Sequence, residues 1–346
     1  MTQPLAITLG DPAGIGPEII AKAASQGELQ NCVVFGDPAH LQRALDVLGM
    51  TDWRLQVLQP GVGLLAATEP CAIAVADPAL WPGLPQADPA STSSLVPWGQ
   101  VNARAGMLAA QAVVAASQAA LRGEVSGVVT APLHKEALSA AGFDYPGHTE
   151  LLQAQAAAFK GVAIADMPVR MMLANDELRT VLVSIHVSLR EALELVTTER
   201  VLQTIRITHE SLSKLLGHPP RIAVAGLNPH AGEGGLFGRE DIDHIAPAVA
   251  QAQALGINAS GPHAPDTVFM RARAGEFDVV VAMYHDQGLI PVKYLGLDEG
   301  VNVTLGLPLV RTSPDHGTAF DLAGTGRADP ASLLAALRMA RRLVAM

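Results

Sequence analysis

Cysteine, aromatic and charged residues are all scarce in this chain. Its 346 residues include 2 cysteines, 4% aromatic residues and 16% charged residues, while 49% are hydrophobic. Cys32 and Cys71 form no CxxC motif, so we expect two buried thiols in a reducing compartment and no disulfide framework. The length suggests two domains of ordinary size, and the apolar excess suits buried parallel strands between alanine-rich helices.

Positive charge is also in short supply. The chain has 23 Lys and Arg residues against 33 Asp and Glu residues, which gives a formal net charge of −10. A protein that binds nucleic acid usually presents a basic face, so we expect no nucleic acid partner. A small anionic substrate remains possible, because a local cluster of Lys, Arg and His can override the global sign.

No segment has the pattern of a signal peptide or a membrane span. The N-terminal segment MTQPLAITLGDP has neither a charged n-region nor a long apolar run. The longest uncharged stretch, residues 105–121, contains Gln111, Ser117 and Gln118 and is shorter than the roughly 20 apolar residues that a span needs. We therefore expect a buried helix there, and a cytoplasmic protein with no membrane partner.

Two common nucleotide-binding motifs are missing. The segment GDPAGIGPE follows a predicted strand, but Pro17 and Glu18 replace the rest of a G-x-G-x-x-G fingerprint. No GK[ST] is present, which excludes a P-loop. The segment predicts either a plain tight turn or a helix start whose backbone N–H groups bind an anion.

Strand and helix patterns alternate along the chain. We expect strands at 5–9 and in NCVVFGDP, CAIAVAD, VSGVVTAP, RIAVAGL, FDVVVAMY and VNVTLGLPLVRT, a hairpin in MPVRMMLANDELRTVLVSIH, and irregular structure over 59–97. We expect helices at 18–25, 40–48, 102–122, 147–159 with Thr149 as the cap, 190–216, 239–255 and 331–346. A further helix is expected to begin within LHKEAL, after the strand and turn of VSGVVTAP. This alternation predicts an α/β fold with a mostly parallel sheet.

Three histidines each stand just beyond a β-branched apolar run. They are His186 in LRTVLVSIHVSL, His230 in RIAVAGLNPHAGEGG and His285 in FDVVVAMYHDQG. The carboxyl ends of parallel strands share one edge, so three imidazoles delivered there could bind a divalent metal. Asp286 and Glu233 are nearby carboxylates that could fix the imidazole tautomers. The alternative is three separate structural histidines.

Three further segments carry polar groups. In PGHTE, His148 and Thr149 precede a helix and could hold a phosphate, or Thr149 could be a plain N-cap. Lys293, Asn302 and Arg311 flank apolar runs, where they could bind an anion or be ordinary surface residues. The glycine-rich segment 313–330 could wrap a nucleotide, with Asp321 bonded to a ribose or adenine, or be a surface loop.

Taken together, these motifs resemble one known family. They are GDPAGIGPE, PGHTE, GLNPHAGEGG, YHDQGLIPVK, GVNVTLGLP and RTSPDHGTAFDLAGTG, and they extend over residues 10–330. The chain resembles the 4-hydroxythreonine-4-phosphate dehydrogenases of pyridoxal phosphate biosynthesis and, more distantly, the isocitrate and isopropylmalate dehydrogenases. The resemblance implies two α/β/α domains around a cleft, with 1–134 plus 312–346 on the cofactor side and 135–311 on the metal, substrate and dimer side.

The resemblance also implies roles for particular residues. The metal ligands would be His186, His230 and His285, in a site built across the interface of a homodimer, with Zn, Co or Mg as the cation. Substrate would contact His148, Thr149, Lys293, Asn302 and Arg311. NAD or NADP would bind near Gly14, His316, Gly317, Thr318 and Asp321. The base would be Asp266, Asp286 or Lys293.

The implied reaction is oxidation of 4-phosphooxy-L-threonine at C3. Its 3-oxo product would lose CO₂ to give 3-amino-2-oxopropyl phosphate. A related dehydrogenase of phosphorylated sugar acids such as 4-phospho-D-threonate is an alternative, and the spelling GPHAPDTVF, with His263 ahead of Asp266, leaves the substrate open. A phosphate acyltransferase, which can share the broad fold, and a non-catalytic regulator are alternatives of other classes.

Overall fold

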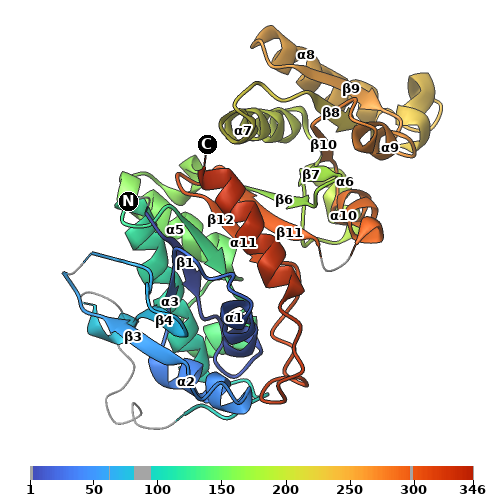
Figure 1. Cartoon of the computed structure of the whole chain (residues 1–346). Helices are drawn as coiled ribbons and strands as arrows, with labels where there is room; N and C mark the ends of the chain where they lie inside the picture. The colour runs from blue at the N-terminus through green and yellow to red at the C-terminus, as the bar shows by residue number, and fades with distance from the viewer. Residues whose placement is uncertain (1–2, 62, 82–94, 297–298, 346) are drawn as a thin grey trace. The chain divides into compact units, whose positions relative to one another are not determined.

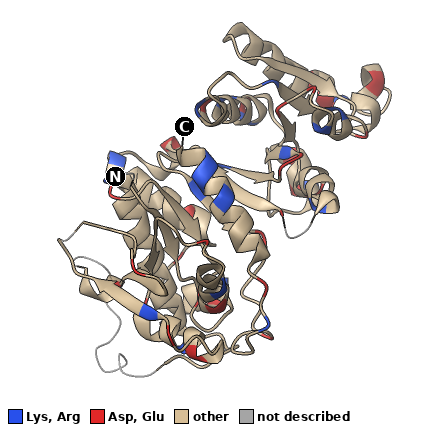
Figure 2. Ribbon diagram, viewed as in Figure 1, with Lys and Arg blue, Asp and Glu red and all other residues tan. Residues whose placement is uncertain are grey.

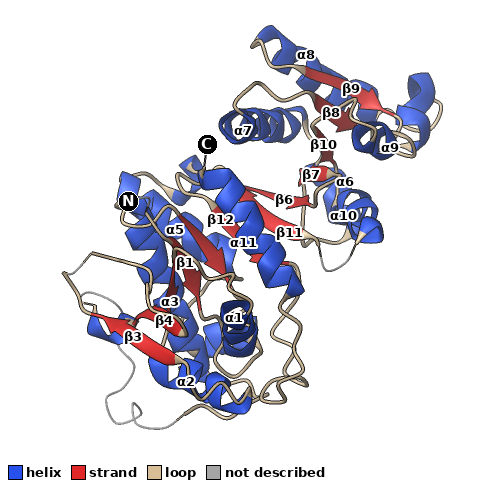
Figure 3. Cartoon of the chain, in the orientation of Figure 1, coloured by secondary structure: helices blue, strands red, loops and turns tan. Residues whose placement is uncertain are grey.

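Short runs of Val, Ile, Leu and Ala form the strands of two units in this chain. The structure, a computed structural model, describes residues 3–61, 63–81, 95–296 and 299–345 (Figure 1). Unit 1 comprises the chain up to Met167 together with Leu307–Val344, and unit 2 comprises Pro168–Gly306. In each unit, strands are flanked by helices (Figure 3), so the predicted α/β class is confirmed.

Unit 1 holds a parallel sheet. Its order is β3-β4-β2-β1-β5-β12, with every neighbouring pair parallel. The strands are β1 (Leu5–Thr8), β2 (Cys32–Phe35), β3 (Arg54–Leu58), β4 (Ala72–Ala76), β5 (Gly127–Thr130) and β12 (Arg311–Pro314). The helices are α1 (Gly16–Ser25), α2 (Pro38–Val47), α3 (Ala103–Leu121), α4 (Lys135–Ala140), α5 (His148–Lys160) and α11 (Ala331–Val344), with short turns η1 (Pro78–Leu80) and η3 (Ile164–Asp166).

The core of unit 1 lies on both faces of this sheet. Apolar residues of α3 and α5 pack on one face, where Val113 and Leu152 are fully buried with Val33 and Val128 of the strands. On the other face, α11 lies against β12, and the Thr312 hydroxyl donates to the Ala336 carbonyl at 2.9 Å. The parallel strands therefore end at one common edge, where loops can meet.

Unit 2 holds a mixed sheet. Its order is β11-β6-β7-β10-β8-β9, in which β6 is antiparallel to both neighbours and the other pairs are parallel. The strands are β6 (Arg170–Ala174), β7 (Arg179–Leu182), β8 (Ile222–Ala225), β9 (Ala259–His263), β10 (Val279–Ala282) and β11 (Val301–Leu305). The helices are α6 (Leu189–Leu195), α7 (Thr198–Leu216), α8 (Ala246–Ala254), α9 (Val268–Arg273) and α10 (His285–Leu295), with turns η4 (Pro229–Gly235) and η5 (Asp241–Ile245).

The predicted hairpin is β6 and β7. Its turn is held by Asn175, whose side-chain oxygen accepts from the backbone N–H groups of Glu177 and Leu178 at 2.9 and 2.8 Å. This bonding is the Asx-turn chemistry that the Asn-Asp dipeptide predicts.

The unit boundaries differ from the expected domain boundaries. Residues 135–167 lie in unit 1, because Leu151 and Leu152 of α5 join the apolar cluster of α3. Arg311 also lies in unit 1, because β12 pairs with β5 through Arg311 and Thr312. The expected changes at 134/135 and 311/312 therefore fall at 167/168 and 306/307.

Three local predictions are wrong. Helix α5 begins at His148 with Gly147 as the N-cap and no side-chain cap bond, so Thr149 does not cap it. The single strand expected over VNVTLGLPLVRT is two strands, because Gly306 takes a left-handed φ of 90°. Arg311 therefore begins β12 instead of ending β11. Cys71 is exposed, although Cys32 is buried as expected.

The placement of charged residues and the hydropathy of the helices agree with what the composition predicts. Acidic and basic residues are interspersed along the ribbon of both units, and several basic residues lie on α11 (Figure 2). Two of its arginines, Arg338 and Arg341, pair with Glu28. In the part of the chain that the structure describes, no helix combines the length and apolar character needed to cross a bilayer. The irregular segment expected over 59–97 falls partly on residues 62 and 82–94, which lie outside the described residues.

Candidate functional site

The three histidines follow three neighbouring strands of unit 2. His186 comes after β7, His230 lies in the turn η4 after β8, and His285 begins α10 directly after β10. Strands β7, β10 and β8 are adjacent and parallel, so all three histidines lie at the carboxyl edge of the sheet, as predicted.

Two of these histidines lie together. The rings of His186 and His285 are 5.6 Å apart between centroids and tilted by 45°. They line a pocket of about 260 Å³ with Tyr284 and Asp286. The Nδ1 atom of His285 is 2.7 Å from Asp286 Oδ1, which is the tautomer-fixing contact expected for this carboxylate. A proton held on Nδ1 leaves Nε2 as a lone-pair donor.

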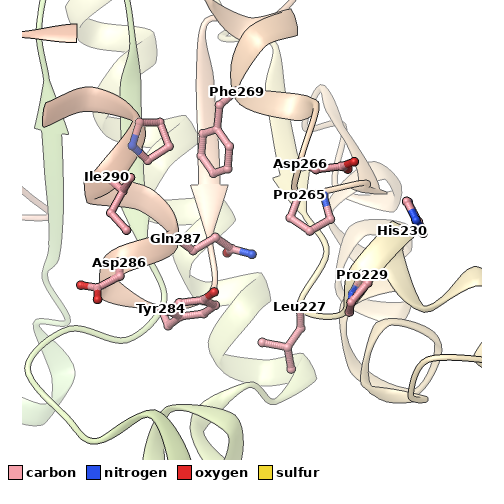
Figure 4. A pocket seen from close by; sticks show the side chains of 11 residues that line it. Leu227, Pro229, His230, Pro265, Asp266, Phe269, Tyr284, Asp286, Gln287 and Ile290 are labelled. Carbon is pink, nitrogen blue, oxygen red and sulfur yellow. The ribbon is translucent and has the colours of Figure 1, made fainter. Parts of the chain in front are cut away.

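His230 lies apart from that pair. It lines a larger pocket of about 700 Å³ with Asp266, Tyr284, Asp286 and Gln287. Figure 4 shows His230 and Asp286 on opposite sides of this pocket. Among the residues described, no three His, Cys, Asp or Glu side chains gather closely enough to hold a metal ion. The chain by itself therefore brings together two of the three expected ligands.

The loop that carries His230 has an unusual backbone. From His230 to Gly234, five consecutive residues are left-handed, with φ between 41° and 78°. His230, Ala231 and Glu233 are not glycines, and a left-handed conformation costs an L-residue roughly 1–2 kcal/mol. Such strain persists only where surrounding contacts impose it, and it concentrates at functional sites.

In unit 1, a buried Arg311 and a half-buried His148 form a polar cluster. Arg311 is 3% exposed, and its Nε and Nη2 atoms donate to the Thr130 hydroxyl at 3.2 and 2.8 Å. Burial lowers the pKa of Arg311 to about 10. Burial, and then the charge of Arg311, lower the pKa of His148 well below its usual value, so its ring is neutral at pH 7.

This cluster is suited to an anion. The Nε2 atom of His148 is enclosed and has no hydrogen-bond partner in the structure. The desolvated guanidinium can gain from a bound phosphate, and the unpartnered Nε2 atom of the neutral ring can accept a hydrogen bond from a hydroxyl group. Thr149, also expected to bind substrate, lies half-buried in the first turn of α5.

The other expected substrate residues belong to unit 2. Lys293 lies in the last turn of α10, and Asn302 lies in β11 opposite Leu173 of β6. Asp266, a predicted base, lies exposed in the loop between β9 and α9 and lines the His230 pocket.

The two loops expected to bind cofactor meet in unit 1. The Ile15 N–H donates to the Thr318 carbonyl at 3.0 Å, and a Cβ on Gly14 would lie 2.9 Å from Thr318 Cβ. Gly14 thus has no room for a side chain. The other three expected residues of the second loop, His316, Gly317 and Asp321, are exposed.

Sequence reasoning missed the side chains that hold this second loop. Glu18 of α1 is fully buried and accepts from the backbone N–H groups of Gly324 and, at 2.8 Å, Gly326. Lys22, one helical turn later, donates to the carbonyls of Gly326 and Ala328 at 2.8 and 2.6 Å. A charged residue on the apolar side of a short helix is the signal that could have identified Glu18.

A second missed residue is Asp11. It is fully buried, and its Oδ1 accepts from the Ala13 N–H at 2.8 Å while Oδ2 has no partner. Burial raises its pKa to about 6, opposed in part by that hydrogen bond and by His134. His134 in turn stacks on Phe320, with ring centroids 4.9 Å apart.

Comparisons with known proteins cover nearly the whole chain. It is 51% identical to a 4-hydroxythreonine-4-phosphate dehydrogenase of Beijerinckia indica over 99% of this chain and 96% of that protein. It is 45% identical to a D-threonate 4-phosphate dehydrogenase of Salmonella typhimurium over 99% of both. The crystal structure of a 4-hydroxythreonine-4-phosphate dehydrogenase from Klebsiella pneumoniae matches with a TM-score of 0.85 and 42% identity, over 99% of this chain and 98% of that one.

The family model described as "Pyridoxal phosphate biosynthetic protein PdxA" matches residues 28–340. That match includes both units, the three histidines and the Arg311 cluster. Together with the high-identity relatives, it shows that this chain belongs to the PdxA family.

Proposed function

We propose that this protein is an NAD(P)-dependent, metal-assisted dehydrogenase that oxidises 4-phosphooxy-L-threonine at C3. The observation that carries this proposal is the buried Arg311 beside the half-buried His148, in a chain 51% identical to a 4-hydroxythreonine-4-phosphate dehydrogenase. Arg311 would bind the phosphate, while the neutral His148 ring, whose N–H donates to the Ala131 carbonyl, would accept one hydrogen bond at Nε2. Thr149, Lys293 and Asn302 would complete the substrate contacts.

The chemistry fits a decarboxylating sequence. Oxidation at C3 requires a hydride acceptor, which is what a nicotinamide dinucleotide supplies. The 3-oxo acid has its carbonyl β to the carboxylate, so the carbonyl can accept the electron pair released when CO₂ leaves. The product would be 3-amino-2-oxopropyl phosphate. We place the dinucleotide at the loops of unit 1 that contain Gly14, His316, Gly317, Thr318 and Asp321.

We further propose a shared metal site in a homodimer. Imidazole nitrogens suit Zn or Co, and His186 with His285 offers two such donors side by side. His230 would come from the second copy, because it does not meet the other two within one chain. A divalent cation held by these histidines would lower the pKa of a substrate hydroxyl group. Mg is a further possibility for the cation.

Among the three expected bases, the geometry favours Asp266. The carboxylate of Asp286 is engaged with His285 Nδ1, so its role would be to orient that ring. Asp266 is exposed at the mouth of the His230 pocket and can accept a proton there. Lys293, in the last turn of α10, would then serve as a charged substrate contact. We expect the enzyme to work in the cytoplasm, where unpaired cysteines stay reduced.

A second substrate deserves a parallel test, because a relative 45% identical over 99% of the chain is a D-threonate 4-phosphate dehydrogenase. The first experiment measures reduced-nicotinamide absorbance with 4-phosphooxy-L-threonine and with 4-phospho-D-threonate, each with and without a chelator. Chelator-sensitive turnover of the first substrate supports the proposal. Turnover of the second alone would move the enzyme to sugar-acid oxidation. If neither substrate gives reduced nicotinamide, the proposal is overturned.

The shared metal site has its own test. Two inactive variants, His230→Ala and His285→Ala, are mixed, exchanged and assayed. If His230 acts across the dimer, half of the dimers are mixed and each contains one intact site, so about a quarter of the wild-type activity returns. If all three ligands come from one chain, no mixture regains activity.

A further inference from the structure

The loop from Gly226 to Gly238, which carries His230, is fixed by contacts with one buried carboxylate. Asp241 is fully buried, and its Oδ1 accepts from the Leu227 N–H at 2.8 Å. Its Oδ2 accepts from the backbone N–H of Asn228 at 3.1 Å and from the Asn228 side chain at 2.9 Å. Three donors from Leu227 and Asn228, which precede Pro229 and the left-handed segment, therefore converge on a single side chain.

Gly226 and Gly238 stand at positions where a side chain would collide with the groups that make this contact. A Cβ on Gly226 would lie 2.8 Å from Asp241 Oδ1 and 2.9 Å from Ala231. A Cβ on Gly238 would lie 2.7 Å from both Asn228 Nδ2 and Glu240 Oε2. The loop closes tightly around the carboxylate and the amide because neither glycine has a side chain.

The base of the loop is tied to the pocket wall. The Gly226 N–H donates to the His263 carbonyl at 2.7 Å, and the Gln287 side chain donates to the Gly226 carbonyl at 2.8 Å. The loop is thus fixed at its start and at Asp241, while His230 itself is exposed. These hydrogen bonds hold the backbone of the loop and leave the His230 imidazole available to bind a metal ion.

We infer that Asp241 is a positioning residue that imposes the left-handed conformation of residues 230–234 and so directs His230 outward. Without the carboxylate, the N–H groups of Leu227 and Asn228 lose their acceptor, and the left-handed segment can relax toward ordinary backbone conformations. The inference concerns this loop directly, and it rests on the proposed function only for its consequence in metal binding.

The test compares Asp241→Asn with Asp243→Asn. Asp243 lies in the same short helix but is exposed and paired with Arg239, so its variant is a matched control for loss of one charge. For Asp241→Asn, we expect faster hydrogen exchange of the amides in 229–238 and a 10- to 100-fold weaker affinity for Co²⁺ measured by titration. The KM for the dinucleotide should not change, and Asp243→Asn should behave like the wild type.

Wild-type hydrogen exchange and Co²⁺ affinity in Asp241→Asn would overturn the inference. If that variant does not fold, Asn228→Ala tests the inference in its place. This variant removes only the side-chain amide that bridges Asp241 and Glu240. It should give the same two changes at smaller size, and their absence would overturn the inference. A wild-type protein that binds no Co²⁺ would refute the proposed metal site instead, and the hydrogen exchange would still report on the loop.

Discussion

Three charged side chains of unit 1, Arg311, Glu18 and Asp11, differ from the three histidines of unit 2 in how completely one chain encloses them. In unit 1, Arg311 is 3% exposed, and Glu18 and Asp11 are fully buried. In unit 2, His186 and His230 are exposed, and the side chain of His285 is 35% exposed. Folding of one chain therefore buries the first group of side chains and leaves the second group exposed, where further contacts can form.

The surroundings of the open group are apolar. Exposed large side chains lie on the elements that carry the histidines, including Leu189 on α6, Leu236 after η4, and Ile290 and Tyr294 on α10. Tyr294 is 90% exposed. Contiguous exposed apolar residues mark interaction surfaces more often than ordinary surface. They fit our proposal that a second copy of the chain covers this part of unit 2.

The largest expected effect comes from removing a histidine of the open group. We expect His285→Ala to lower kcat by more than about 10²-fold, because losing a ligand should exceed the roughly 10–100-fold cost of losing an outer-shell partner. Metal content by mass spectrometry should fall with it, while circular dichroism stays unchanged because the side chain is partly exposed. Full turnover with unchanged metal content would show that unit 2 holds no metal site.

Arg311 tests the enclosed group. We expect Arg311→Ala to raise the KM for the phosphorylated substrate about 10- to 100-fold, the range of one or two charge-assisted hydrogen bonds. The KM for the dinucleotide should change little. Arg311→Lys keeps the charge and should recover part of the loss. Equal increases in both KM values would argue that Arg311 only supports the fold through Thr130.

Glu18 tests whether the second loop of unit 1 binds the dinucleotide. In Glu18→Gln, the amide oxygen can accept from only one of the two backbone N–H groups, so we expect about a 10-fold higher KM for the dinucleotide. The KM for the phosphorylated substrate should stay constant. Glu28→Gln, which removes a charge paired with Arg341 beyond the end of α1, is the control. If the KM for the dinucleotide is identical in Glu18→Gln and Glu28→Gln, this loop does not take part in cofactor binding.

The smallest effect concerns stability and pH. Burial raises the pKa of Asp11 to about 6 in the folded state, whereas its ordinary pKa is 3.8. The folded state therefore binds more protons between these values, and the stability from this group is lost as pH rises through about 6. We expect Asp11→Asn to be more stable than wild type by roughly 1–3 kcal/mol at pH 8, with the difference shrinking toward pH 4. Thermal unfolding across this pH range measures it, and a pH-independent difference would contradict it.

Sequence reasoning predicted the elements that carry strong periodicity. It located the strands that deliver the histidines and the Asn175 turn, and it singled out both His148 and Arg311 for anion binding. It missed β3, where Arg54–Leu58 is mostly exposed at a sheet edge, and β9, where Gly261 and Pro262 break the strand pattern. These strands form because neighbours supply their hydrogen bonds, which composition does not reveal.

The loop around Asp241 was also beyond sequence reasoning. Its conformation depends on a carboxylate 14 and 13 residues along the chain from the two residues that bond to it, and on glycines that permit a close approach. Local propensity argues against left-handed His230 and Glu233, so a residue-by-residue expectation gives an ordinary turn. The buried charge of Asp241, within a short helix that is otherwise largely exposed, was the available signal.

The arrangement of unit 1 has a consequence for how the chain folds during synthesis. Lys22 and Ala328 are bonded although they are 306 positions apart, and β12 with α11 comes after the whole of unit 2. A ribosome that makes the chain from its N-terminus exposes β5 long before its last partner strand, β12, exists. The main part of unit 2, Pro168–Gly306, is continuous in sequence and can fold as soon as it emerges, while unit 1 must wait for Leu307–Val344. The slow step of folding is therefore expected to be the closure of unit 1 by β12 and α11.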